Sequence, residues 1–473
     1  MQKFVSKYGL AAHLALLAVA PLFLFPFCGE AWTARVLLWL SLFAGDWILM
    51  EPSRRSGEML HDARFRVASG IIRDPLFWLM LFIVLFAAVR CLNGGVAMKY
   101  DAEGGDWTLT SPAVVFLPGC VKDAGFLPFS VAVAATAVVQ GCRHALGRSA
   151  RMAYLLTSSV LAGIAALAAA IVCSTGNSGV LKIASCGYVD ASYAGVAFGV
   201  HFLASIVAIV GMFEHGWKRV MPLALVGTGG TGIGLFCFAP LPMVLVWVAA
   251  AVLMLVFALT YVGVKVGGIA IPKSLILFSI SLLLPVLFVI GVMPAELRES
   301  RLAYFTGGGL FPENFEALRG VLSSIAAKAW GNHPWIGSGL GSFALDIRFN
   351  ATDADWAVLT PGQLGALNGW WQLLAERGIA GSLFLVAPLA FLFWTYFVRL
   401  AAAVSGVRSR GVAEVIYPMA FLGFLSLASV VVCGFVDHSF FRAETLLAVA
   451  ATVTLAGSSL PAVKKQAPAE MEK

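Results

Sequence analysis

The chain has 473 residues, of which 60% are hydrophobic and 12% charged, and its formal net charge is +7. Soluble globular proteins carry about 25% charged residues, so the composition excludes an ordinary soluble protein and indicates an integral membrane protein. Continuous apolar runs recur along the whole sequence with the length of a membrane-spanning helix, about 20 residues. They exclude an outer-membrane barrel, whose strands would alternate between lipid and a polar lumen.

The apolar runs predict an all-α, polytopic membrane protein with about twelve transmembrane helices. The predicted spans are 9–28, 31–50, 75–93, 125–142, 153–173, 193–213, 220–238, 241–264, 274–293, 377–398, 416–433 and 441–458. Residues 1–293 therefore hold spans one to nine and 377–458 hold spans ten to twelve. Between them, 294–376 form a large loop, and 459–473 form a tail.

Basic residues gather near the N-terminus, in alternate connections between the spans and in the tail. Membrane proteins keep lysine and arginine on the cytoplasmic side. We therefore expect a multi-pass protein of the bacterial inner (cytoplasmic) membrane with both termini in the cytoplasm and loop 294–376 in the periplasm. The excess of lysine and arginine is therefore explained by the orientation of the protein in the membrane. We expect the lipid bilayer to be a partner and do not expect nucleic acid to be one.

Gly227, Gly229 and Gly232 match the GxGxxG pattern of dinucleotide-binding proteins. That pattern needs a preceding strand and a following helix, whereas these glycines lie inside an apolar span. Two interpretations remain open. The glycines allow close helix packing, or they mark a locally unwound helix that lines a cavity.

Charged residues near the outer ends of spans are candidates for a site. Arg35 and Arg90 either extend to the interface or face a common cavity and hold an anionic ligand. Asp437 and His438 lie in the short last outer loop. They form either a solvated turn or a base oriented by a carboxylate.

The large loop contains the most informative motifs. Apolar residues at helical spacing predict an amphipathic helix over 313–330, lying at the outer membrane interface with its apolar face towards lipid. Arg319 on this helix would present a guanidinium, which suits phosphate or pyrophosphate. The glycine-rich stretch that follows His333, with Gly337 and Gly339, favours a turn with free backbone N–H groups.

These motifs together resemble the signature of the O-antigen ligase and O-antigen polymerase superfamily. The resemblance covers about 220–400, and its signature at about 310–381 has an arginine before a P-x-x-G-x-G-x-x-x-F stretch and an E-x-G-x-x-G entry into the next span. The matching residues are Arg319, Pro334, Gly337, Gly339, Phe343, Asn368, Glu376, Gly378 and Gly381.

The resemblance implies metal-independent, inverting glycosyl transfer without a cofactor. The donor would be an undecaprenyl-pyrophosphate-linked glycan, and the acceptor a glycan, a lipid or a protein. Arginines would neutralise the leaving pyrophosphate, a role we assign to Arg319, Arg35 and Arg90. A histidine would activate the acceptor hydroxyl.

Two positions depart from the family pattern. Leu367 stands where the family has its catalytic histidine, and the segment 228–231 stands where the family has an arginine in an earlier span. Three alternatives follow. The base is supplied from another position, either by His438, oriented by Asp437, or by His333; the protein has another chemistry; or it is catalytically silent.

Two other functions compete with this interpretation. A transporter or a flippase of lipid-linked glycans would fit twelve helices with glycine-rich spans, although it has little use for a large outer loop. A peptidoglycan polymerase of the SEDS type would need a loop aspartate, for which Asp346, Asp353 and Asp355 are available.

Overall fold

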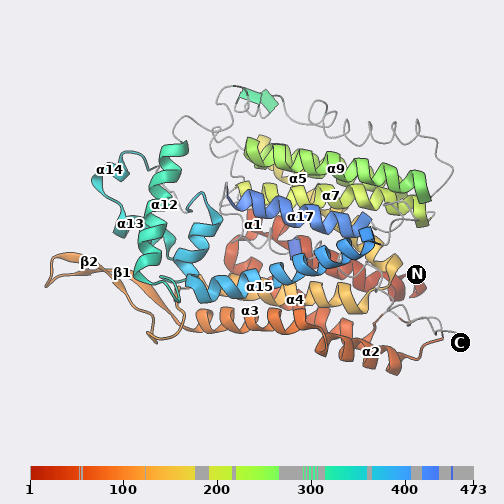
Figure 1. The fold of residues 1–473 in the computed structure, drawn as a ribbon, viewed down its shortest axis with the longest axis horizontal. Helices are drawn as coiled ribbons and strands as arrows, with labels where there is room; N and C mark the ends of the chain where they lie inside the picture. The colour runs from red at the N-terminus through yellow and green to blue at the C-terminus, as the bar shows by residue number, and fades with distance from the viewer. Residues whose placement is uncertain are drawn as a thin grey trace, which may run out of the picture.

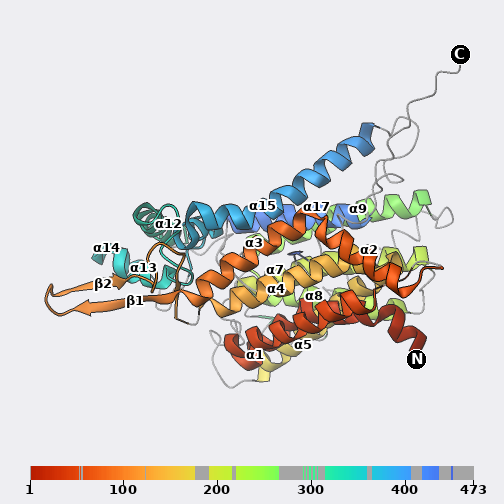
Figure 2. The same cartoon turned by 90° about the horizontal axis from the view of Figure 1, so that it is seen from below.

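The computed structural model describes residues 2–52, 54, 57–122, 124–175, 191–215, 220–265, 315–359, 365–405, 418–435 and 449–450, and scattered residues between 291 and 306. Long helices lie side by side, and short helices and strands cap the end of this bundle that is opposite the N-terminus (Figures 1 and 2). We call that capped end the loop end. The expectation of a helical membrane protein is confirmed.

The helices that form the bundle are α1 (Gln2–Met50), α2 (Leu60–Ile72), α3 (Pro75–Leu92), α4 (Phe126–Gln140), η1 (Gly141–Ala145), α5 (Arg148–Thr175), α7 (Ala191–His215), α8 (Met221–Phe238), α9 (Leu241–Lys265), α15 (Gly369–Ser405) and α17 (Pro418–Gly434). The helices of the loop end are α12 (Phe315–Asn332), α13 (Phe343–Asn350) and α14 (Asp353–Trp356).

Within the described part of the chain, seven helical segments are long and apolar enough to cross a membrane. They are Tyr8–Phe25, Cys28–Met50, Pro75–Leu92, Phe126–Ala145, Ser149–Ile171, Met221–Phe238 and Gly369–Thr395. Shorter apolar segments lie in α7, α9 and α17. Ten of the twelve predicted spans fall on these helices, whereas 274–293 and 441–458 lie almost wholly outside the described residues.

Helix α1 comprises two predicted spans joined without a loop. Its helical hydrogen bonding continues across a kink at Gly29, where φ is 71°. Only glycine adopts such a left-handed conformation without appreciable strain. The kink therefore separates the two spans at the point where the sequence predicts a boundary.

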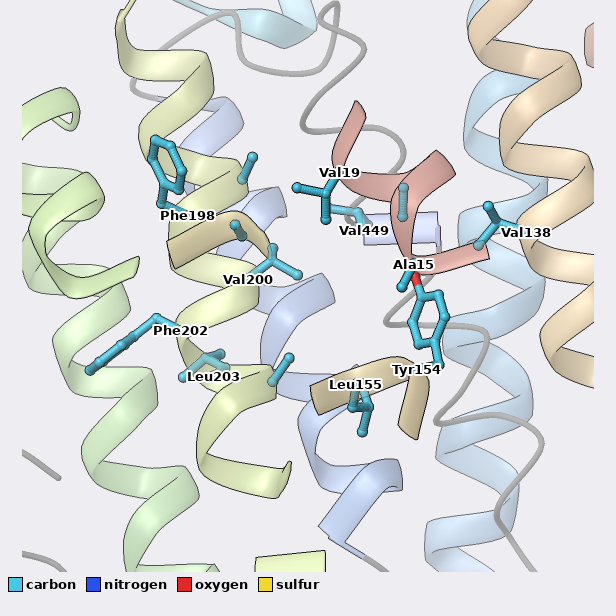
Figure 3. Close-up of a cluster of buried hydrophobic side chains, with 14 of the residues drawn as sticks. Ala15, Val19, Val138, Tyr154, Leu155, Phe198, Val200, Phe202, Leu203 and Val449 are labelled. Atoms are coloured by element: carbon cyan, nitrogen blue, oxygen red, sulfur yellow. The ribbon is translucent and has the colours of Figure 1, made fainter. Parts of the chain in front are cut away.

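The centre of the bundle is apolar and contains side chains from α1, α4, α5 and α7 (Figure 3). Helices α5 and α8 approach closely because glycines face each other. A Cβ at Gly230 would lie 2.5 Å from the carbonyl oxygen of Gly163, and one at Gly227 would lie 3.1 Å from the Ser159 backbone. The glycine pattern at 227–232 therefore serves close packing inside a continuous helix.

A small sheet stands at the loop end, between the predicted spans 75–93 and 125–142. Strand β1 (Gly94–Asp101) pairs antiparallel with β2 (Asp106–Thr110) and parallel with the short β3 (Cys120–Val121). The hairpin β1–β2 projects away from the bundle (Figures 1 and 2). The described part of the chain is thus helical with one β element, which membrane-span periodicity does not reveal.

The helix predicted over 313–330 is α12, but its predicted placement is wrong. Its apolar residues Leu322, Ile325 and Ala329 are buried in a separate small core that also contains Phe343 of α13 and Ala375 of α15. The apolar face is therefore covered by the protein's own loop end and does not lie on lipid. Helical periodicity identifies a buried face without specifying what covers it.

Candidate functional site

An apolar cavity lies between α3, α4, α15 and α17. Met80, Val131, Leu389 and Val430 are among the residues that line it. Its charged lining comes from Arg90, two residues before the end of α3, and from Arg377, near the start of α15. Both arginines lie towards the loop end, whereas the rest of the lining is almost entirely hydrocarbon.

Arg90 is 1% exposed and reaches across to the loop. Its Nη2 donates to the carbonyl oxygens of Ile336 at 2.7 Å and of Glu376 at 3.0 Å, and its guanidinium lies 4.9 Å from the centre of the Phe86 ring. No described group accepts a hydrogen bond from Nε or Nη1, although both are buried. Buried donors are costly when unsatisfied, so these two N–H groups are suited to an anionic ligand in the cavity.

Arg377 is the second buried cation and was not singled out from the sequence. It is 8% exposed and lines the same cavity as Arg90. The carboxylate of the adjacent Glu376 accepts hydrogen bonds from Gly341 N and Gln372 Nε2, both at 3.1 Å. The glutamate is thus held by the glycine-rich turn and by its own helix, and the cavity keeps an excess of positive charge.

The two glycine motifs of the sequence interlock beside these arginines. Helix α15 is broken at Gly378, where φ is 62°, and the turn around Gly337, where φ is 72°, lies against the break. A Cβ at Gly337 would lie 2.4 Å from Arg377 N, and one at Gly378 would lie 2.5 Å from Gly337 N. Only glycine permits backbones to approach this closely.

Backbone hydrogen bonds connect the two motifs across the break in α15. They run from Ser338 N to Ala375 O (2.9 Å), Gly339 N to Glu376 O (3.2 Å), Ile379 N to Pro334 O (2.9 Å) and Ala380 N to Trp335 O (3.0 Å). The glycine-rich turn therefore satisfies backbone groups that a broken helix would otherwise leave unpaired.

A buried carboxylate holds the turn from the other side. Asp346 of α13 is 3% exposed, and its Oδ2 accepts hydrogen bonds from Ser338 Oγ at 2.7 Å and Ser342 Oγ at 3.1 Å. Burial raises the pKa of Asp346 to about 6, although the two serine hydrogen bonds oppose that shift. Because Asp346 does not line the cavity, its role here is to fix the glycine-rich turn.

The other predicted pyrophosphate ligands lie away from the cavity. Arg35 is exposed, and its Cζ lies 5.6 Å from the centre of the Trp32 ring. Arg319 donates from Nη2 to Phe435 O at 2.6 Å and so connects α12 to the end of α17. Neither lines the cavity that contains Arg90. Of the three predicted arginines, only Arg90 is therefore placed in this cavity.

The remaining predicted loop residues lie at the ends of helices or in the turn. His333 is exposed at the end of α12, and Gly339 adopts a φ of 125°. Asn368 immediately precedes α15, and its Oδ1 accepts hydrogen bonds from the N–H groups of Trp370 and Trp371. Asp437 and His438 lie outside the described residues.

Leu367, the residue before Asn368, has a φ of 50°. Non-glycine residues rarely adopt this conformation, and asparagine, aspartate and histidine tolerate it better than leucine. The side chain of Leu367 cannot accept a proton, so this position cannot supply a base.

No model of a known protein family matches the chain, and a search of curated proteins finds no significant match.

Proposed function

We propose that the protein is a membrane glycosyltransferase that uses a polyprenyl-pyrophosphate-linked glycan, as the resemblance to the O-antigen ligases implies. The cavity carries this proposal, because its hydrocarbon walls suit an isoprenoid chain and two buried guanidinium groups lie at one end. Arginine binds phosphate oxygens in a bidentate manner. We assign the pyrophosphate to Arg90 and Arg377 in place of Arg319 and Arg35.

The proposal includes the topology. Twelve spans in the bacterial inner membrane, with both termini in the cytoplasm, would place loop 294–376 and the hairpin β1–β2 in the periplasm. The distribution of basic residues along the sequence supports this orientation. The lipid-linked donor would then enter the cavity from the outer leaflet.

In the proposed reaction, an acceptor hydroxyl attacks the anomeric carbon of the donor glycan and the bond to the pyrophosphate oxygen breaks. Negative charge develops on the pyrophosphate as it leaves, and fixed cations in a site of low polarity stabilise that charge. A base must remove the hydroxyl proton. That role stays assigned to His438, oriented by Asp437.

The test is transfer by the full chain reconstituted in liposomes with an undecaprenyl-pyrophosphate-linked glycan and a panel of glycan and lipid acceptors. Released undecaprenyl pyrophosphate is measured by mass spectrometry. Arg90→Lys and Arg377→Lys should each lower the rate by about tenfold or more, since a lysine lacks the bidentate fork. Arg35→Lys, an exposed arginine, is the matched control and should retain the wild-type rate.

Other outcomes would replace the proposal. Movement of the intact donor between leaflets without cleavage would indicate a flippase. The absence of both cleavage and movement would indicate a catalytically silent relative. Full activity of both lysine variants would show that the pyrophosphate does not bind in this cavity.

A further inference from the structure

Helix α2 lies at the end of the bundle that holds the N-terminus, opposite the hairpin (Figures 1 and 2). One face of this helix packs on the protein. Ala63 and Val67 are fully buried, and a Cβ at Gly70 would lie 2.9 Å from Nδ1 of His144 in the π-helical turn η1. The short helix therefore has a defined inner face.

Polar contacts fix α2 in this orientation. Arg66 donates from Nε and Nη2 to the Glu58 carboxylate at 2.8 and 3.2 Å, and from Nη1 to His144 O at 3.4 Å. Asp74, in the turn between α2 and α3, binds Arg143 at 2.6 Å and His144 at 3.1 Å. Because these contacts hold the inner face, the helix is not free to rotate and bury its outer face against the protein.

The outer face of α2 is apolar and uncovered. Phe65 is 71% exposed and Ile72 is 59% exposed, and their seven-residue spacing places them on one side of the helix. Trp78 of α3 is also exposed, and its Nε1 donates to Ile72 O at 2.9 Å. The exposed Phe82 extends this row along α3, a helix long and apolar enough to cross a membrane. The apolar face of α2 is thus continuous with an exposed apolar surface on α3.

Arginines flank the apolar row. At 100° per residue, Arg64 and Arg73 project on opposite sides of the line from Phe65 to Ile72, and both are exposed. Asp62 is an exposed acid on the same helix, and Arg54 adds a further exposed cation before it. Exposed aromatic and aliphatic side chains bordered by arginine are typical of a helix that lies in the headgroup region of a membrane.

We infer that α2 is an in-plane membrane anchor. Phe65 and Ile72 insert into the leaflet at the N-terminal end of the bundle, and Arg64 and Arg73 bind the headgroups of anionic phospholipids there. The helix would then fix the depth of α3, which carries Arg90 near its other end. This inference does not depend on the proposed enzymatic activity.

Hydroxyl-radical footprinting of the unmodified chain in lipid nanodiscs tests the insertion. Phe65 should be oxidised several-fold more slowly than Phe349, an exposed side chain of α13 at the loop end that is 45% accessible in the protein alone. Oxidation of Phe65 as fast as Phe349 would overturn the proposal, because Phe65 is the more exposed of the two within the protein.

Native mass spectrometry of the chain with equal phosphatidylglycerol and phosphatidylcholine tests the headgroup. The wild type should retain phosphatidylglycerol preferentially, and each of Arg64→Gln and Arg73→Gln should weaken that retention by about fivefold. Arg348→Gln, which changes an exposed arginine at the loop end, is the control and should have no effect. Equal retention of both lipids by the wild type, or unchanged retention of phosphatidylglycerol in both variants, would refute anionic headgroup binding.

Discussion

The interlock of Gly337 with Gly378 makes a strong prediction about stability. Gly337→Ala and Gly378→Ala each add a methyl group where a Cβ would lie 2.3 to 2.5 Å from several backbone atoms. Backbone cannot move aside as the end of a flexible side chain can. The turn must therefore leave the break in α15, or α15 must straighten.

The expected cost combines two terms. A non-glycine residue held at a φ of 72° or 62° costs about 1–3 kcal/mol. Displacement of the turn also breaks hydrogen bonds such as Ser338 N to Ala375 O, each worth about 1 kcal/mol. We expect a loss of about 3–5 kcal/mol, which corresponds to a change of roughly 150-fold to 5,000-fold in the opening equilibrium.

Amide hydrogen exchange of the full chain in nanodiscs measures this opening. The N–H groups of Ile379 and Ala380, which bond to the glycine-rich turn, should exchange faster in both variants. Gly320→Ala is the control, since nothing lies within 4 Å of a Cβ there and alanine favours the α12 helix by about 0.5–1 kcal/mol. Unchanged exchange at Ile379 and Ala380 in Gly378→Ala would refute the interlock.

Three further results are expected from thermal unfolding of the purified chain. Burial raises the pKa of Asp346 to about 6, so ionisation of this residue should lower stability by about 3 kcal/mol in total as the pH rises from about 4 to 6. Asp346→Asn should remove that dependence, and equal pH profiles of the variant and the wild type would contradict it. Burial opposes ionisation of Asp74, but a hydrogen bond from His144 and the charge of Arg143 outweigh burial and lower the pKa of Asp74. The stability that Asp74 contributes should therefore persist at neutral pH and disappear below about pH 4. Asp74→Asn should abolish this acid-dependent loss, and an unchanged pH profile would be inconsistent with the ion pair. Gly230→Ala should destabilise by about 1–3 kcal/mol by separating α5 from α8, and a wild-type midpoint would show that their packing is not tight.

Much of the fold follows from local sequence pattern. Apolar runs locate the helices of the bundle because a membrane span needs only length and hydrophobicity. Gly29 separates two spans in a position that hydropathy also predicts. The glycine-rich stretch at 337–339 was expected to form a turn, and it does so with positive φ values.

The composition of the cavity depends on contacts between distant segments. Arg90 meets Ile336 and Glu376 across more than 240 residues of sequence, and no local pattern reports such a pair. Arg377 was missed because it stands at the predicted boundary of span ten, where an arginine is ordinary. Its position immediately before Gly378, at a helix break, is the signal that could have identified it.

Binding of the lipid donor in the cavity is tested most directly by photocrosslinking. A polyprenyl pyrophosphate with a diazirine on its isoprenoid chain is irradiated with the full chain in nanodiscs, and the labelled residues are mapped by mass spectrometry. Labels should fall on the cavity wall, at residues such as Met80, Val131 and Leu389, and Arg90→Lys should reduce them. Labelling confined to α7, α8 and α9, or labelling unaffected by Arg90→Lys, would contradict a pyrophosphate-lipid site between α3 and α15.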